Sequence, residues 1–178
     1  MDLRPAIPDE LAAVAALVNG AYRGEGSRQG WTTEADDIGG QRTDPAMLAA
    51  DLAAAPGARL LVMRDEPGGP LLGCVWLEPA EPGVWYLGML TVRPDLQDRQ
   101  LGRTLLAAAE RSAAGEGAAR IRITVVSIRD TLIAWYQRRG YALTGETRPF
   151  PYDEPLFGVP KRPDLAFVVL EKALPGAG

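Results

Sequence analysis

The sequence predicts an α/β fold, a single domain built on a mixed β-sheet of about six to seven strands flanked by helices. The 178 residues are enough for one domain with a real core, and few for two. Short apolar, β-branched runs alternate with segments of helical periodicity. Residues 84–126 read as strand, loop, helix and strand, and the almost wholly apolar run 121–126 is typical of a buried parallel strand. These features indicate a right-handed βαβ unit inside a larger sheet.

Local start and stop signals define the individual elements. Asp44 followed by Pro45 is a helix cap with proline at the first helical position. The Pro/Gly turn at 65–70 makes its two flanking strands a hairpin. In chain order we expect strand 3–7, helix 9–22, a glycine-rich segment 24–40 with one helical turn from Thr32 or Thr33, helix 44–54, strands 59–64, 71–78 and 84–92, helix 102–114, strand 121–126, a short helix within 129–141, strand 141–147, a proline-rich loop 148–163 and strand 165–170. We therefore expect one domain at residues 1–173 and a frayed tail at 174–178.

Composition excludes several classes of function. No apolar run approaches the roughly 18 residues of a transmembrane helix, so no membrane partner is expected. The first ten residues lack a signal-peptide pattern, which favours a cytoplasmic protein. A net charge of −4 and a pI near 5.0 argue against nucleic acid as a partner. The single cysteine, Cys74, lies in an apolar run and is expected to be a buried hydrophobe.

The chain contains no histidine. Ser-His-Asp and Cys-His nucleophilic systems are therefore excluded in their usual forms, and so is histidine-ligated zinc. The acidic residues are scattered without a D-x-D pattern, so no metal site is expected. Any proton transfer must use tyrosine, a carboxylate, lysine, a terminus or water.

The segment 86–109 indicates a phosphate-bearing ligand. A strand ends at Arg93-Pro94, a polar loop follows, and a helix opens at Gly102. Main-chain N–H groups at a helix start lack intrahelical partners and lie at the positive end of the helix dipole, so they can cradle phosphate. Neither a P-loop nor a dinucleotide fingerprint is present. The pattern V-x-P-x-x-Q-x-x-Q-x-G-x-x-L-L, residues 92–106, instead resembles the signature of the GNAT superfamily of N-acetyltransferases, with Gln100 in place of its first glycine.

A second segment resembles a later motif of the same superfamily. Residues 129–141 match N-x-x-A-x-x-L-Y-x-x-x-G-F in frame, with Tyr136 at the tyrosine and Tyr141 at the phenylalanine. Arg129 and Leu132 stand at the asparagine and alanine positions. Ser127 and Asp130 form a capping pattern for this helix, and Gly140 suits its end. Two matches in the right order and at the right separation identify the chain as a GNAT member.

The resemblance implies acetyl-CoA as co-substrate. In GNAT proteins the strands corresponding to 84–92 and 121–126 splay apart, and the pantetheine arm lies in the gap, bonded to backbone groups. An acetyl carbonyl held there would point at a main-chain N–H that stabilises the oxyanion. The residues implied in cofactor binding are Leu90, Thr91, Val92, Gln97, Asp98, Arg99, Gln100, Leu101, Gly102, Arg103 and Thr104.

Tyr136 is the candidate catalytic residue. An acceptor amine attacks directly in this superfamily, so no protein nucleophile is needed, and a phenol bonded to sulfur would act as general acid to the leaving thiolate. The alternative is a tyrosine that only packs on the sheet. The general base is unassigned, with Glu34, Glu78 and Glu81 as the nearest carboxylates and a water chain as the alternative.

The acceptor site is expected in the segment 22–42. Trp31 and Glu34 are the candidate substrate-binding residues, because an indole beside a carboxylate suits an amine-bearing ligand. Trp31 could equally anchor its loop. Phe150, Tyr152 and Phe157 could close the other side of the site or form a homodimer contact. The predicted function is N-acetyl transfer to a small-molecule amine or an amino-acid-like metabolite, and the alternative is a non-catalytic CoA-binding regulatory domain of the same fold.

Overall fold

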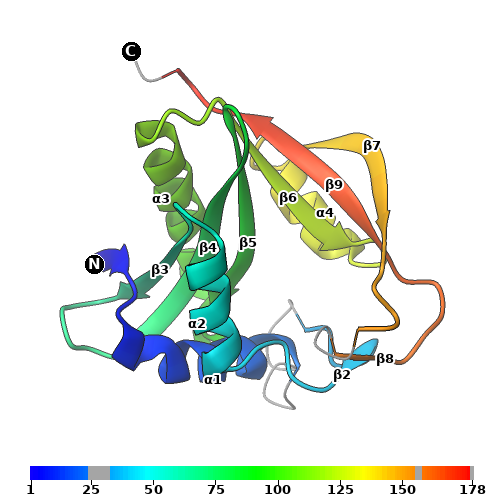
Figure 1. Ribbon diagram of the computed structural model, residues 1–178, viewed down its shortest axis with the longest axis horizontal. Coiled ribbons are helices and arrows are strands. Elements are labelled where there is room, and N and C mark those ends of the chain that lie inside the picture. Colours follow the sequence, from blue (N-terminus) through cyan, green and yellow to red (C-terminus); the bar gives the residue numbers. More distant parts are fainter. Residues whose placement is uncertain (24–32, 155–157, 177–178) are drawn as a thin grey trace.

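A seven-stranded sheet with strands in the order β1-β3-β4-β5-β6-β9-β7 forms the centre of the molecule (Figure 1). The computed structural model describes residues 1–23, 33–154 and 158–176. The strands of this sheet are β1 (Asp2–Pro5), β3 (Arg59–Arg64), β4 (Leu71–Glu81), β5 (Val84–Val92), β6 (Arg120–Val126), β7 (Ala142–Pro149) and β9 (Ala166–Ala173). All neighbouring pairs are antiparallel except β5 and β6, which run parallel. The predicted mixed α/β sheet is confirmed.

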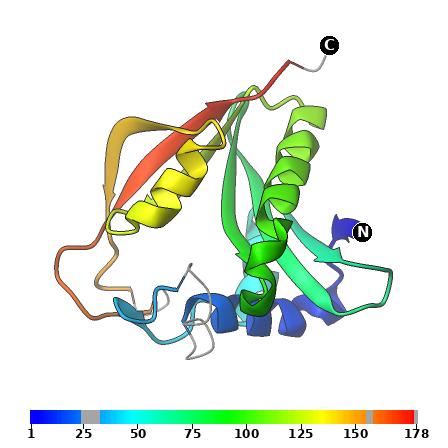
Figure 2. The same ribbon diagram turned by 180° about the vertical axis from the view of Figure 1, so that it is seen from behind.

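Helices cover both faces of the sheet. They are α1 (Leu11–Tyr22), α2 (Pro45–Ala54), α3 (Leu101–Gly115) and α4 (Asp130–Gln137), with short 3-10 turns η1 (Pro8–Glu10) and η3 (Pro94–Arg99). In Figure 1 α1 and α2 lie in front of the sheet, and Figure 2 shows α3 and α4 on the opposite face. The predicted Asp44 cap is confirmed, because its Oδ1 accepts from the N–H of Met47 at 2.8 Å.

The two helical layers bury alternate residues of the same strands. In β3, Leu61 and Met63 pack toward α3, whereas Leu60 and Val62 pack toward α1 and α2. Successive side chains of a strand point to opposite faces of the sheet, and both faces are covered by helices. The strand sequences are therefore continuous apolar runs. Cys74 is fully buried in the α1 layer, as predicted. Leu105 of α3 is also fully buried, and its truncation to alanine would cost about 2–5 kcal/mol.

Some boundaries differ from the predictions. The polar loop before α3 is the 3-10 turn η3, because Pro94 fixes a helical φ at its first position. The proline-rich segment contains β8 (Val159–Pro160), which pairs with β2 (Ile38–Gly39) in a small second sheet. Leu174, the first residue of the expected tail, is buried, and its N–H donates to the carbonyl oxygen of Ala119.

Candidate active site

Strands β5 and β6 are paired only at their beginnings. The parallel register starts with Val84 opposite Arg120 and ends with Tyr86 opposite Arg122. Strand β6 pairs with β9 over its whole length, so it remains in the sheet while β5 diverges from it. Figure 1 shows the two halves of the sheet separating from this junction. The sheet is therefore open between β5 and β6, as the GNAT resemblance implied.

A β-bulge in β5 lies beside this opening. Two residues, Met89 and Leu90, oppose a single residue of β4, because the register shifts between Cys74 and Trp76. Met89 has φ 54°, a left-handed conformation that costs an L-residue about 1–2 kcal/mol. Bulges and strained backbone concentrate at functional sites, where they redirect main-chain groups. The bulge therefore makes the middle of β5 a candidate position for contact between the main chain and a ligand.

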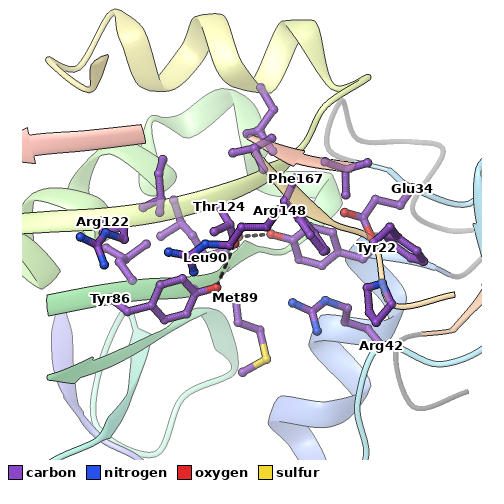
Figure 3. A pocket seen from close by; sticks show the side chains of 18 of the residues that line it. Tyr22, Glu34, Arg42, Tyr86, Met89, Leu90, Arg122, Thr124, Arg148 and Phe167 are labelled. Atoms are coloured by element: carbon purple, nitrogen blue, oxygen red, sulfur yellow. Dashed lines mark hydrogen bonds between the residues drawn. The ribbon is translucent and has the colours of Figure 1, made fainter. Parts of the chain in front are cut away.

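The Tyr86 side chain lies across the opening. Its hydroxyl is 3.4 Å from the hydroxyl of Thr124 on β6, and this contact bridges the diverging strands (Figure 3). Gly88 makes room for the ring, since a Cβ at that position would come within 2.8 Å of Cε1 of Tyr86. Tyr86 and Thr124 are site residues that sequence reasoning missed. The only local signal was a glycine two residues after a tyrosine in a strand.

A cavity of about 530 Å³ occupies the space between β5 and β6. This volume lies within the range of roughly 300–1,000 Å³ typical of small-molecule sites. Its wall includes Tyr86 to Leu90 on β5, residues 122–126 on β6, Leu132 and Tyr136 on α4, and Tyr22 at the end of α1. Phe150, in the loop after β7, closes another side, which is one of the two roles expected for it. The opening thus has the size and the mixed polarity of a ligand site.

Tyr136 lies on the cavity wall. It is the buried residue of α4, with its ring edge-on to Trp135 at 5.0 Å and to Tyr141 at 5.5 Å between centroids. Burial, followed by the charges of nearby tyrosines, raises the pKa of Tyr136 well above its usual range. The phenol is therefore protonated throughout the neutral range and can donate a hydrogen bond into the cavity.

Glu34 also lies on the cavity wall, within a buried ionic cluster. One carboxylate oxygen accepts from Nε of Arg23 and the other from a guanidinium nitrogen of Arg129, each at 3.1 Å. Arg129 is 9% exposed, and its Nη2 is buried without a hydrogen-bond partner. Glu34 thus joins the segment 22–42, where the acceptor site is expected, to the start of α4. Trp31, the other predicted substrate-binding residue, lies outside the described residues.

The expected phosphate cradle lies where η3 meets α3. Gln100, at the position of the family's first glycine, is the N-cap of α3 and has φ 58°, a left-handed conformation. Gly102 is in the first turn of the helix, and a Cβ there would make only ordinary contacts, the nearest 3.6 Å from Trp135. The protein's own conformation therefore does not require glycine at 102. Its lack of a side chain leaves the helix start accessible to a ligand.

Helix α4 begins differently from the prediction. Its N-cap is Arg129, without a side-chain capping bond, so the predicted Ser127–Asp130 cap is wrong. The Arg129 side chain is instead held by Glu34, a contact between residues 95 positions apart that local patterns cannot foresee. The end of the helix follows the prediction, since Gly140 has φ 91° and the N–H of Tyr141 returns to the carbonyl of Tyr136.

A second hollow, about 470 Å³, lies between α3 and α4 next to the cradle. Four cationic side chains line it, Arg103, Arg138, Arg139 and Lys172. The Arg139 guanidinium stacks 3.6 Å from the centre of the Trp135 ring. Glu110 is the carboxylate of this hollow and accepts from Lys172 at 2.7 Å. Beside the start of α3 the basic groups therefore outnumber the acidic one, and this excess of positive charge favours the binding of a phosphate group.

The three carboxylates considered as general base are differently placed. Glu34 and Glu78 line the cavity. Glu81 binds the Arg122 guanidinium at 2.5 Å, and this hydrogen bond lowers the pKa of Glu81. A carboxylate with a lowered pKa is a weaker base, so Glu81 is the least suited of the three.

Comparison with known families identifies the chain. A model of the acetyltransferase (GNAT) family matches residues 17–141, which is well over half of the sequence and includes the second half of α1, the bulged strand, the cradle and α4. The chain belongs to the GNAT acetyltransferase family. Its departures from the family signature, Gln100 and Arg129, are therefore features of a GNAT protein: Gln100 has a left-handed backbone, and Arg129 binds Glu34.

Solved structures of GNAT proteins share this fold. A ribosomal-protein-alanine N-acetyltransferase from Brucella melitensis has a TM-score of 0.71 and 20% identity, over 98% of this chain and 100% of that one. A phosphinothricin acetyltransferase from Sinorhizobium meliloti, solved with AcCoA, has a TM-score of 0.71 and 14% identity over 99% and 89%. yncA from Salmonella typhimurium, solved with acetyl-CoA, has a TM-score of 0.67 and 20% identity over 99% and 96%. At these identities the likeness shows the fold alone.

Three further observations concern this GNAT protein. No curated protein matches the chain. Within residues 1–23, 33–154 and 158–176, no three His, Cys, Asp or Glu side chains are grouped so that they could hold a metal ion. No helix in the same ranges combines the length and apolar character needed to cross a membrane.

Proposed function

We propose that the protein transfers an acetyl group from acetyl-CoA to a primary amine of a small molecule or amino-acid-like metabolite. The observation that carries the proposal is the continuity of the site. The opening between β5 and β6 contains the bulge and has Tyr136 on its wall. The N-terminus of α3 adjoins the end of β5 and α4, since a Cβ at Gly102 would lie 3.8 Å from Val92 and 3.6 Å from Trp135. One ligand with a phosphate group and an extended acyl arm fits these adjoining parts.

The residues proposed for acetyl-CoA follow from this arrangement. The amides of Gln97 to Thr104 would bind the pyrophosphate, and the basic hollow beside α3 would accept a further phosphate. Main-chain groups of Leu90, Thr91 and Val92 would hold the arm along β5. Acetyl-CoA supplies the activated acyl group, and the chain's own residues bind it, orient it and exclude water.

Tyr136 is the proposed general acid. The acceptor amine, in its neutral form, attacks the acetyl carbonyl directly, and the Tyr136 hydroxyl hydrogen-bonds the departing sulfur. Its raised pKa supports a donor that stays protonated at neutral pH. A phenol of raised pKa is a weak acid, so its contribution is a hydrogen bond to the thiolate more than full proton transfer. The CoA thiol has a pKa of about 8.5, so the thiolate is a tolerable leaving group even when it is not protonated.

Trp31 and Glu34 are proposed to belong to the acceptor site. The support is that Glu34 lines the cavity next to Tyr22, to whose carbonyl oxygen its N–H donates at 2.8 Å. A small acceptor is favoured because the cavity has only about 530 Å³, with Ile38, Phe150 and Pro151 on its wall. Similar structures include one named for a protein substrate and one named for phosphinothricin, so the cavity of this chain is the better guide.

The test is thiol release from acetyl-CoA in the presence of a panel of primary amines, with the acetylated product identified by mass. Amine-dependent release supports the proposal. Tight CoA binding by calorimetry, without thiol release for any amine, would contradict the proposal and favour a non-catalytic CoA-binding domain. Gln100 and Arg129, which depart from the family signature, are the residues that raise this alternative.

A further inference from the structure

Arg42 is held at the acceptor end of the cavity by a rigid main-chain anchor. The Asn19 side chain of α1 accepts from the N–H groups of Arg42 and Thr43, at 2.7 and 3.1 Å, and donates to the carbonyl of Thr43 at 2.8 Å. Three hydrogen bonds from one amide fix the backbone that carries Arg42. Its half-buried guanidinium extends from this anchor into the cavity (Figure 3).

Arg42 differs from the other arginines on the cavity wall in its partners. Arg23 is paired with Glu34, Arg122 with Glu81 and Glu171, and Arg148 with Glu146. Among the described residues, no carboxylate forms an ion pair with Arg42. A half-buried guanidinium with an anchored backbone and no anionic partner has its fork of donors available to a ligand.

The charge around Arg42 is positive. Among the described residues, Arg42 and the buried cluster of Arg23, Glu34 and Arg129 together have three positive charges and one negative, a net +2. The cavity wall also includes the carboxylates Glu78 and Glu154, and neither forms an ion pair with Arg42. Burial lowers the pKa of Arg23, and repulsion from Arg42 adds to this effect. A purely cationic amine would be repelled here, whereas a ligand anion would relieve the repulsion.

We propose that the acceptor is an amine that also carries a carboxylate, and that Arg42 binds this carboxylate; the inference rests on the proposed acetyl transfer. The acceptor would thus be an amino acid or a close analogue. Its carboxylate lies at Arg42, and its amine reaches the bulge of β5. The positive surroundings also favour the neutral form of the amine, which is the form that attacks. The apolar side chains of Met89, Phe150 and Phe167 on the cavity wall can contact the side chain of the acceptor.

The experiment compares acceptors that differ only in charge. Thiol release is measured with amino acids of varied side chain and with their carboxamides, for the wild type, Arg42→Gln, Arg42→Lys and Arg111→Gln. Arg111 is an exposed residue of α3 and controls for loss of one arginine. The quantity compared is the ratio of kcat/KM for carboxylate to that for carboxamide, because differences in amine basicity cancel between variants. Thermal midpoints check that each variant is folded.

We expect Arg42→Gln to lower this ratio by about ten-fold or more, since a charged hydrogen-bonded pair is lost. Arg42→Lys should restore most of it, and Arg111→Gln should leave it unchanged. A ratio unaffected by Arg42→Gln, or turnover of carboxamides alone, would overturn the role of Arg42 while acetyl transfer stands. Absence of thiol release with every acceptor would overturn the proposed function and this inference together.

Discussion

The Tyr22 hydroxyl donates a 2.5 Å hydrogen bond to the main-chain carbonyl oxygen of Leu90. Tyr22 also accepts from the N–H of Glu34 through its own carbonyl, at 2.8 Å. The last residue of α1 thus ties the acceptor-side segment to the bulge of β5. Burial raises the pKa of Tyr22 to about 12, so the hydroxyl remains a donor at neutral pH.

Tyr22→Phe tests this connection. The change leaves the Leu90 carbonyl without its partner, which should cost about 1–2 kcal/mol and lower the thermal midpoint by about 2–8 °C. It should also lower kcat, because the bulge that positions the acetyl group is less well held. Tyr152→Phe is the matched control, since the Tyr152 hydroxyl donates to the Arg162 carbonyl in a loop away from the bulge. Equal kcat in both variants would contradict the link between Tyr22 and catalysis.

Tyr136→Phe tests the proposed acid. The variant should bind CoA normally and reduce kcat by about ten-fold to a thousand-fold. Because the pKa of Tyr136 is raised, ionisation of this phenol should cause no loss of wild-type activity between about pH 7 and 10. Tyr141→Phe serves as control: its hydroxyl donates to Glu110 at 3.0 Å, outside the cavity. If Tyr136→Phe has the kcat of the wild type, Tyr136 only packs against its neighbours and is not the general acid.

Gly102→Glu tests the phosphate cradle. A side chain and a negative charge at the start of α3 should weaken CoA affinity at least ten-fold by calorimetry, through steric conflict and repulsion of the pyrophosphate. Gly115→Glu places the same side chain at the far end of α3, where nothing lies within 4 Å of the added Cβ, and should leave affinity unchanged. Unaltered CoA affinity in a folded Gly102→Glu protein would remove this site assignment.

Gln100→Gly tests the left-handed cap. At φ 58° glycine avoids the strain of an L-residue, but it loses more conformational entropy on folding. The net increase in the free energy of unfolding should be about 0.5–1 kcal/mol. The urea midpoint should rise with an unchanged slope. Gln137→Gly, at an exposed helical position of α4, should instead destabilise by about 1 kcal/mol. Destabilisation by Gln100→Gly would show that the Gln100 side chain makes a compensating contribution.

Glu34→Gln tests the acceptor assignment. Loss of the carboxylate shared by Arg23 and Arg129 should destabilise the protein by about 2–4 kcal/mol, because two buried guanidinium groups lose their counter-charge. Because Glu34 is proposed to belong to the acceptor site, its loss should raise KM for the amine and leave KM for acetyl-CoA nearly unchanged. Glu116→Gln breaks the exposed pair with Arg59 and should cost under about 1 kcal/mol. A stability loss without a selective change in amine KM would contradict the acceptor role of Glu34.

The sequence by itself determined the order along the chain of the helices α1 to α4 and of the strands of the seven-stranded sheet, the cap of α2, the glycine end of α4, the buried Cys74 and the membership of the GNAT family. Each of these is encoded within a few residues, by apolar periodicity, turn chemistry or motif spacing. The resemblance also led to Tyr136 and to the helix start at Gly102. Only the tertiary structure decided which side chains share the cavity.

The missed residues explain this limit. Tyr86 and Thr124 meet because two strands diverge, and Arg42 faces the cavity because Asn19, 23 positions earlier, holds its backbone. The predicted Ser127–Asp130 cap does not form; Arg129 is the N-cap of α4, and its side chain binds the buried carboxylate of Glu34. Contacts between residues distant in the chain depend on how the layers pack, and local patterns carry no record of that packing.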